Sequence, residues 1–205
     1  MLEEKDQPEY DFIRQLSQKY QIPFRLESLE ESVRGYKIED EIVLNRHLPP
    51  ERRNWTFCHE LGHIILGHSA KPNDLEEREA DACAAELMLP ERDFAADAAN
   101  LDLDKLKALY PHASYEVLAR RCLQYMPALL TIFDNGEITF RAASFNLAFP
   151  KRPAPIEMEV FSCCLNNKAK FEKSDDTMNV KGWYIDQRPP VIRIILISEP
   201  LAGVD

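Results

Sequence analysis

Apolar residues recur at helical spacing in the first part of the chain. Phe12, Ile13 and Leu16 lie on one face of a helix predicted over residues 8–20, and Pro8 suits its first turn. The other helices are predicted over residues 51–66, 74–89 and, as two or three short helices, 91–126. Extended segments are predicted over residues 22–29 and 35–44, the second bent into a hairpin around Asp40.

The ends of the two longest predicted helices carry recognisable signals. Pro49 and Pro50 precede the helix over 51–66, and Gly67 is expected to stop it. Asn73 or Asp74 is expected to cap the next helix, which ends before Pro90. The interior of this second helix is rich in alanine, so it can approach a neighbouring helix closely.

Beyond Pro127 the apolar positions follow the spacing of strands. Asp134-Asn135-Gly136 lies between two apolar runs and is a strong hairpin signal. Further strands are predicted over residues 157–165, 179–185 and 191–198. A helical first part and a strand-rich second part predict an α+β protein, with domains over residues 1–126 and 127–205.

Composition narrows the classes of protein to which the chain could belong. Of its 205 residues, 45% are hydrophobic, and the formal net charge is −10. Such a charge disfavours binding to a phosphate backbone, so we expect no direct nucleic-acid partner. We expect a cytoplasmic protein outside the membrane. The N-terminus is acidic and the chain has no long apolar run, and its five cysteines lack metal-knuckle spacing, as in a reducing compartment.

The pattern His59-Glu60-Leu61-Gly62-His63 carries the candidate chemistry. Residues four apart lie on the same face of a helix, so both imidazoles can bind one zinc ion. Glu60 lies beside that face, where it could act as a general base without occupying a coordination position. Manganese or iron can occupy similar sites, so the spacing does not fix the metal.

A catalytic zinc needs a third protein ligand, for which the sequence offers two candidates. His68 follows the helix-ending Gly67 and lacks the metzincin spacing, so it reads as a surface residue or a partner of a ligand. Glu77 on the next helix is favoured over it. Asp81 is four residues further along the same face, placed to hydrogen-bond a ligand histidine. Glu76 and Glu79 are expected to point elsewhere, to solvent or to backbone.

Three separated segments resemble the ImmA/IrrE family of bacterial metallopeptidases. They are residues 55–68, the run Glu77-Arg78-Glu79-Ala80-Asp81, and residues 84–90. The resemblance implies a helical, zincin-like core with a small N-terminal sheet, in which His59, His63 and Glu77 bind zinc and Glu60 is the base. It also implies a helix-turn-helix-like bundle over residues 91–126. Residues 127–205 match nothing firmly, and we expect a sensing or partner-binding role for them.

The resemblance further implies a function, since similar proteins cleave helix-turn-helix repressors of the XRE type in stress responses or mobile elements. Two alternatives stay open: a zinc-stabilised module that binds a repressor or antitoxin without cutting it, and a transcriptional regulator using residues 114–125 as a recognition element. The extended segment ending at Asn45 is expected to hold substrate as an added strand. Candidates for a second oxyanion donor are Tyr110, His112, Tyr115 and Tyr184.

Overall fold

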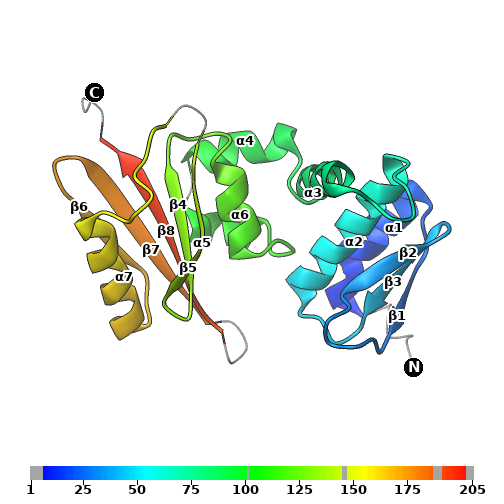
Figure 1. Ribbon diagram of the computed structural model, residues 1–205. Helices are drawn as coiled ribbons and strands as arrows, with labels where there is room; N and C mark the ends of the chain where they lie inside the picture. The colour runs from blue at the N-terminus through cyan, green and yellow to red at the C-terminus, as the bar shows by residue number, and fades with distance from the viewer. Residues whose placement is uncertain (1–6, 101, 145–146, 187–190, 202–205) are drawn as a thin grey trace. The chain divides into compact units, whose positions relative to one another are not determined.

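The chain forms two compact units in a computed structural model that describes residues 7–100, 102–144, 147–186 and 191–201 (Figure 1). One unit comprises Met1–Ala96 with Asp104–Val117, and the other comprises Asp97–Leu103 with Leu118–Asp205. The α+β fold class predicted from the sequence is confirmed, with helices dominating the first part and strands the second. The domain ranges 1–126 and 127–205 stay a prediction, and their outermost residues lie outside the described part.

The first unit contains a small mixed sheet covered by helices (Figure 1). Its elements are the 3-10 turn η2 (Pro8–Tyr10), α1 (Asp11–Tyr20), β1 (Phe24–Glu27), β2 (Gly35–Ile38), β3 (Glu41–Asn45), α2 (Pro50–Ile65) and α3 (Asp74–Met88). The short helices α4 (Glu91–Asn100), α5 (Leu103–Leu109) and α6 (Tyr115–Cys122) follow and have residues in both units.

The sheet of the first unit has the order β1-β3-β2, with β1 parallel and β2 antiparallel to β3. The strand that ends at Asn45 is therefore the central one, paired on both sides. The extended segment predicted over residues 35–44 thus contains both this central strand, which has no free backbone edge, and β2, which lies at the edge of the sheet. The expectation that the segment holds substrate as an added strand stays a prediction, and only its β2 part can do so. The edge strands of this sheet are β1 and β2.

Helix α2 packs on this sheet through a fully buried apolar face. Phe57 and Leu61 have no exposed surface, and the ring of Phe57 meets that of Phe24 edge-on at 5.9 Å between centroids. Ile42 and Leu44 of β3 are equally buried. Because this face is anchored in the core, the residues on the remaining face of α2 have fixed positions relative to β2.

The second unit is built on an antiparallel five-stranded sheet in the order β5-β4-β8-β7-β6. Its elements are β4 (Leu129–Asp134), β5 (Glu137–Ala143), α7 (Pro155–Asn167), β6 (Phe171–Ser174), β7 (Met178–Asp186) and β8 (Ile192–Pro200). The turn between β4 and β5 is the predicted hairpin, with Asn135 and Gly136 at φ of 51° and 88°. Both values lie in the left-handed region that this tight turn demands.

The strand predicted over residues 157–165 is wrong, because this segment is helix α7. Pro155 occupies the first helical turn, and the carboxylate of Glu157 accepts the backbone N–H of Ala154 at 2.7 Å. Ile156, Val160 and Cys164 recur every four residues and pack on the sheet. The runs of apolar residues around them concealed this helical period.

A buried ion pair ties α7 to the sheet. Arg141 of β5 donates to both carboxylate oxygens of Glu157, at 2.9 and 3.0 Å, and Ser198 of β8 donates to the same group at 3.0 Å. Burial by itself would raise the pKa of Glu157, but these hydrogen bonds and that of Ala154 hold it below its ordinary value. The network therefore stabilises the ionised form of a carboxyl group that water does not reach.

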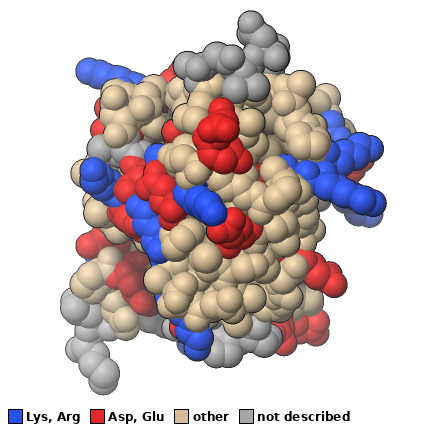
Figure 2. All heavy atoms as spheres, turned by 90° about the vertical axis from the view of Figure 1, so that its left-hand side faces the viewer, with Lys and Arg blue, Asp and Glu red and all other residues tan. Residues whose placement is uncertain are grey.

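One face of the described part of the chain carries charged side chains of both signs. On the face shown in Figure 2, acidic and basic side chains lie interspersed, without a large basic patch among the residues described there. Arg120 of α6 stacks on Phe140 at 3.7 Å, and Arg121 is only 9% exposed. These two residues pack within their unit, which argues against a recognition helix. No helix of the described chain is long and apolar enough to cross a bilayer.

We predict that Glu157→Gln destabilises the second unit by about 3 kcal/mol at neutral pH, because it leaves Arg141 buried without a counter-charge. Urea unfolding followed by the fluorescence of Trp183 in a Trp55→Phe background measures this. The control Glu159→Gln lies on the same helix and breaks an exposed pair with Lys173, so it should change stability by less than about 1 kcal/mol.

The same variant has an expected pH dependence. A lowered folded-state pKa means that Glu157 contributes stability above its ordinary value of 4.5 and loses it as the pH falls through the folded-state value. The difference in unfolding free energy between wild type and Glu157→Gln should therefore narrow as the pH falls from 4.5 through the folded-state pKa of Glu157. An equal difference at pH 7 and pH 3 would contradict the role given to the ion pair.

Candidate metal centre

Helix α2 presents both histidines of the motif on the face that is not packed on the sheet. Their ring nitrogens Nε2 lie 3.1 Å apart, and the rings meet edge-on at 4.7 Å between centroids. His63 is 3% exposed and His59 is partly exposed. Two imidazoles one helical turn apart thus point the same nitrogen at one place, as metal ligands do.

Helix α3 begins with a complete capping box. Asn73 accepts the backbone N–H groups of Leu75 and Glu76 at 2.9 and 3.2 Å, and Glu76 accepts the N–H of Asn73 at 2.9 Å. Glu76 also accepts the N–H and hydroxyl of Ser69 at 3.1 and 3.2 Å. The start of α3 is therefore fixed to the loop that returns from α2, and this sets the position of Glu77 one residue later.

The two helices approach each other closely at Gly62. A Cβ atom at this position would lie 3.1 Å from the carbonyl oxygen of Ala80 and 3.2 Å from the Cβ of Cys83. The alanines predicted to permit close packing are used in this way, since Ala80 and Ala84 are fully buried. This approach brings the side chain of Glu77 over the two histidines.

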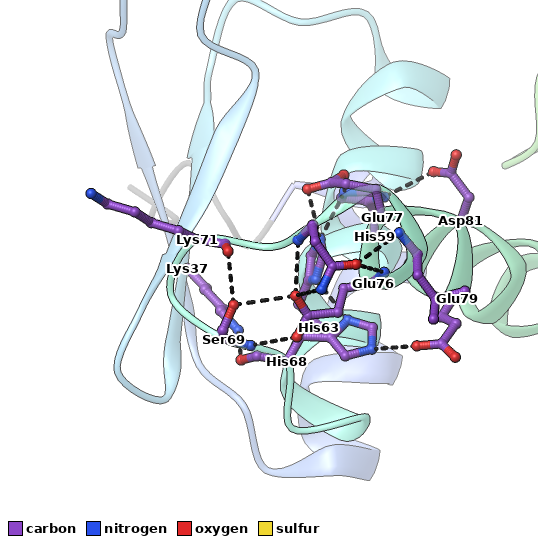
Figure 3. Close-up of polar contacts among 12 residues, drawn as sticks. Lys37, His59, His63, His68, Ser69, Lys71, Glu76, Glu77, Glu79 and Asp81 are labelled. Atoms are coloured by element: carbon purple, nitrogen blue, oxygen red, sulfur yellow. Dashed lines mark hydrogen bonds and ion pairs between the residues drawn. The ribbon is translucent and has the colours of Figure 1, made fainter.

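Three ligand atoms converge at this point (Figure 3). The atoms offered by His59, His63 and Glu77 lie within 4.8 Å of one another. Nε2 of His59 is 3.3 Å from Oε2 of Glu77, and Nε2 of His63 is 3.8 Å from Oε1. Ligands at 2.0–2.1 Å around a tetrahedral zinc ion are about 3.3 Å apart, so these spacings fit one ion. Two imidazoles and one carboxylate form the donor set of an open catalytic zinc site.

Each histidine also has a partner on its other ring nitrogen. Asp81 lies one turn beyond Glu77 on α3, and its Oδ1 is 2.9 Å from Nδ1 of His59. Nδ1 of His63 is 2.9 Å from Nδ1 of His68. The hydrogen bond with Asp81 is the main reason why the pKa of His59 is raised, whereas burial lowers that of His63.

Glu79 differs from the expectation that it faces solvent or backbone. Its Oε2 lies 3.2 Å from Nε2 of His68, whose side chain is 6% exposed. The chain turns back after α2, so His68 lies beneath α3 instead of on the surface. For the position of His68 the sequence contains one signal, the helix-ending Gly67 directly before it. For the contact of Glu79 with His68, the spacing of residues within α3 gives no signal.

Glu60 lies in a half-buried environment beside the ligand atoms. Burial raises the pKa of its carboxyl group, and the charge of His59 and the backbone N–H of Lys37 partly offset this. Lys37 belongs to β2, so the edge strand of the sheet reaches the candidate base. A carboxylate with a raised pKa is suited to accept a proton and return it within one reaction cycle.

The cysteine beside His59 and the four candidates for a second oxyanion donor have surroundings of their own. Cys58 is fully buried and burial raises the pKa of its thiol well above its ordinary value, so it is not poised as a thiolate. His112 hydrogen-bonds the carbonyl of Met88 at 2.8 Å. Tyr115 donates to Asp104, the ring of Tyr110 meets Phe94, and Tyr184 belongs to the second unit.

We predict that Gly62→Val weakens zinc binding at least about tenfold and destabilises the first unit by about 1–3 kcal/mol. The branched side chain would push α3, with Glu77, away from the histidines. Competition with a chromogenic chelator and thermal unfolding measure the two effects. Ala82→Val, at an exposed position of α3, is the control and should leave zinc affinity unchanged. Wild-type affinity in Gly62→Val would contradict the role of this contact.

Comparison with known proteins agrees with the resemblance noted in the sequence. The family model described as IrrE N-terminal-like domain, Peptidase_M78, matches residues 7–123. No match is found among curated proteins. A solved structure, a Mycobacterium tuberculosis transcriptional regulator, has a TM-score of 0.67 at 14% identity, covering 95% of this chain and 70% of that one, which supports the fold alone. Since the family model spans more than half of the chain, the chain belongs to the Peptidase_M78 family, which has an IrrE N-terminal-like domain.

Proposed function

We propose that the chain is a zinc-dependent endopeptidase that cleaves a protein partner. His59, His63 and Glu77 bind the metal, Asp81 orients His59, and Glu60 is the general base. The observation that carries this proposal is the convergence of the three ligand atoms within 4.8 Å of one another, on helices that also bear the half-buried Glu60.

The residues around the metal position divide the chemistry between them. A zinc ion bound there would act as a Lewis acid and lower the pKa of a water molecule to roughly 7. Glu60 accepts the proton of the attacking water and returns it to the leaving amine. The backbone N–H of Lys37 holds the Glu60 carboxylate in place during both transfers. Asp81 keeps the proton of His59 on Nδ1, so that Nε2 stays free for the metal.

The outer edge of β2, which pairs with no other strand of its sheet, is the surface on which an extended substrate would lie. The N–H of Asn45 donates to the carbonyl of Arg34 at 2.9 Å, and hydrogen-bonded pairs alternate along an antiparallel ladder. The backbone N–H and C=O of Tyr36 therefore form hydrogen bonds with β3. Those of Lys37 point away from β3, and the N–H of Lys37 meets Glu60. A substrate strand along this edge would bring its backbone to the base.

The partner we propose is a helix-turn-helix repressor of the XRE type, whose cleavage would relieve repression in a stress response or mobile element. Support comes from the likeness to the ImmA/IrrE family and from the structural neighbour being a transcriptional regulator. We further propose that residues 127–205 sense a signal or bind the partner. A non-cleaving, zinc-stabilised binding module is the alternative, and the experiment below separates the two.

We predict that Glu60→Gln abolishes cleavage while one zinc ion per chain stays bound, because the amide cannot take up a proton at neutral pH. The metal content of wild type and variant is measured first. Each protein is then incubated with the helix-turn-helix repressor encoded next to it in the same genome, and mass spectrometry detects new fragments. Glu51→Gln is the matched control, since Glu51 is at the start of the same helix and pairs with Lys107. It should cleave like wild type.

The outcomes separate the candidate functions. Cleavage by wild type that is lost in Glu60→Gln and with a chelator supports the peptidase and identifies its substrate. Retained cleavage by Glu60→Gln would refute the mechanism. An intact repressor that co-elutes with metal-loaded wild type would favour the non-cleaving module instead.

A further inference from the structure

A hydrogen-bonded chain leads away from His63 on the side opposite to the metal position. Nδ1 of His63 lies 2.9 Å from Nδ1 of His68, and Nε2 of His68 lies 3.2 Å from Oε2 of Glu79 (Figure 3). The two histidine side chains are 3% and 6% exposed. Water therefore has little access to the middle of this chain, and its protons are set by its own members.

The carboxylate at the end of the chain fixes the direction of each hydrogen bond. Ionised Glu79 can only accept, so Nε2 of His68 carries a proton. In neutral His68 the other nitrogen, Nδ1, carries no proton and is an acceptor. It accepts a hydrogen bond from the protonated Nδ1 of His63. Nε2 of His63 is left with its lone pair free. The opposite direction would place a proton on Nε2 of His63, at the metal position.

Helix α2 ends in a way that holds His68 in this place. The N–H of His68 donates to the carbonyl of His63 at 2.9 Å, and that of Gly67 donates to Ile64 at 3.1 Å. Gly67 has a φ of 68°, so the end is a Schellman motif with glycine in the left-handed conformation. Lys37 adds a hydrogen bond from Nζ to the carbonyl of His68 at 2.9 Å. The backbone on both sides of the His68 side chain is thus fixed.

The two ligand histidines are oriented by different means. His59 meets a carboxylate directly, that of Asp81. His63 is buried more deeply and reaches a carboxylate only through His68. Both carboxylates belong to α3, where Glu79 and Asp81 directly flank Ala80. One helix therefore supplies a ligand and the orienting groups of both histidines.

We propose that His68 and Glu79 are positioning residues that hold His63 in the tautomer able to bind metal. This inference rests on the proposed metal site. It assigns a role to a histidine that follows the motif and to an acidic residue that is neither ligand nor base. Partners of this kind typically contribute about 10–100-fold to metal affinity.

The test is the zinc affinity of the whole chain, measured by competition with a chromogenic chelator. His68→Leu and Glu79→Gln should each weaken binding about 10–100-fold. His68→Asn should bind zinc more tightly than His68→Leu, because its amide oxygen can accept a hydrogen bond from Nδ1 of His63. Glu86→Gln removes the same charge from the same helix and should bind zinc like wild type.

A second readout addresses the tautomer itself. Long-range ¹H–¹⁵N spectra of the zinc-loaded wild type should show the proton of His68 on Nε2 and that of His63 on Nδ1. In Glu79→Gln the first assignment should be lost or mixed. A merely structural role for His68 would leave these signals unchanged in Glu79→Gln.

The failures of the two proposals are distinguishable. Unchanged zinc affinity in both His68→Leu and Glu79→Gln, beside a large loss in Glu77→Gln, would overturn this inference and leave the metal site standing. Unchanged affinity in Glu77→Gln, or no zinc binding by wild type, would refute the metal site itself.

Discussion

The close contact between α2 and α3 is the constraint on which the candidate metal centre depends. One helix supplies both histidines and the base, and the other supplies Glu77, so no ligand set exists unless the two backbones come near each other. Gly62 permits this, because any side chain there would meet Ala80 and Cys83. The burial of α2 on the sheet and the capping box of α3 fix the two partners of the contact.

Electrostatics at this contact favour a bound cation. Glu77, Glu79 and Asp81 gather around three histidines (Figure 3), and Glu60 interacts electrostatically with Glu77 and His59. Ionised carboxylates this close repel one another. Their partners reduce the repulsion by holding each group in a defined direction, Asp81 toward His59 and Glu79 toward His68. Among the described residues, the carboxylate of Glu77 and the imidazole nitrogens of His59 and His63 form the one group of ligand atoms that converges on a common point. A divalent ion there would offset the remaining negative charge.

Local signals made much of the fold predictable, and contacts distant in sequence explain what was missed. The helix ends at Gly67 and Asn73 and the hairpin at Asn135 follow from single residues with strong conformational preferences, and they are confirmed. The site residues could be nominated because their spacing is local to one helix or carried by a family signature. Helix α7 was mistaken for a strand because apolar residues surround its buried face. The roles of Glu79 and His68 depend on how two helices meet, which no spacing within either helix contains.

The central claim is that nitrogen and oxygen atoms from α2 and α3 hold a single metal ion. X-ray absorption at the zinc edge, on wild type loaded with one equivalent, tests it most directly. The account predicts nitrogen and oxygen neighbours only, at about 2.0–2.1 Å, with the scattering pattern of two imidazoles. Cys58 and Cys83 lie on the same two helices. A sulfur neighbour at about 2.3 Å would show that a cysteine binds the metal and would contradict the account.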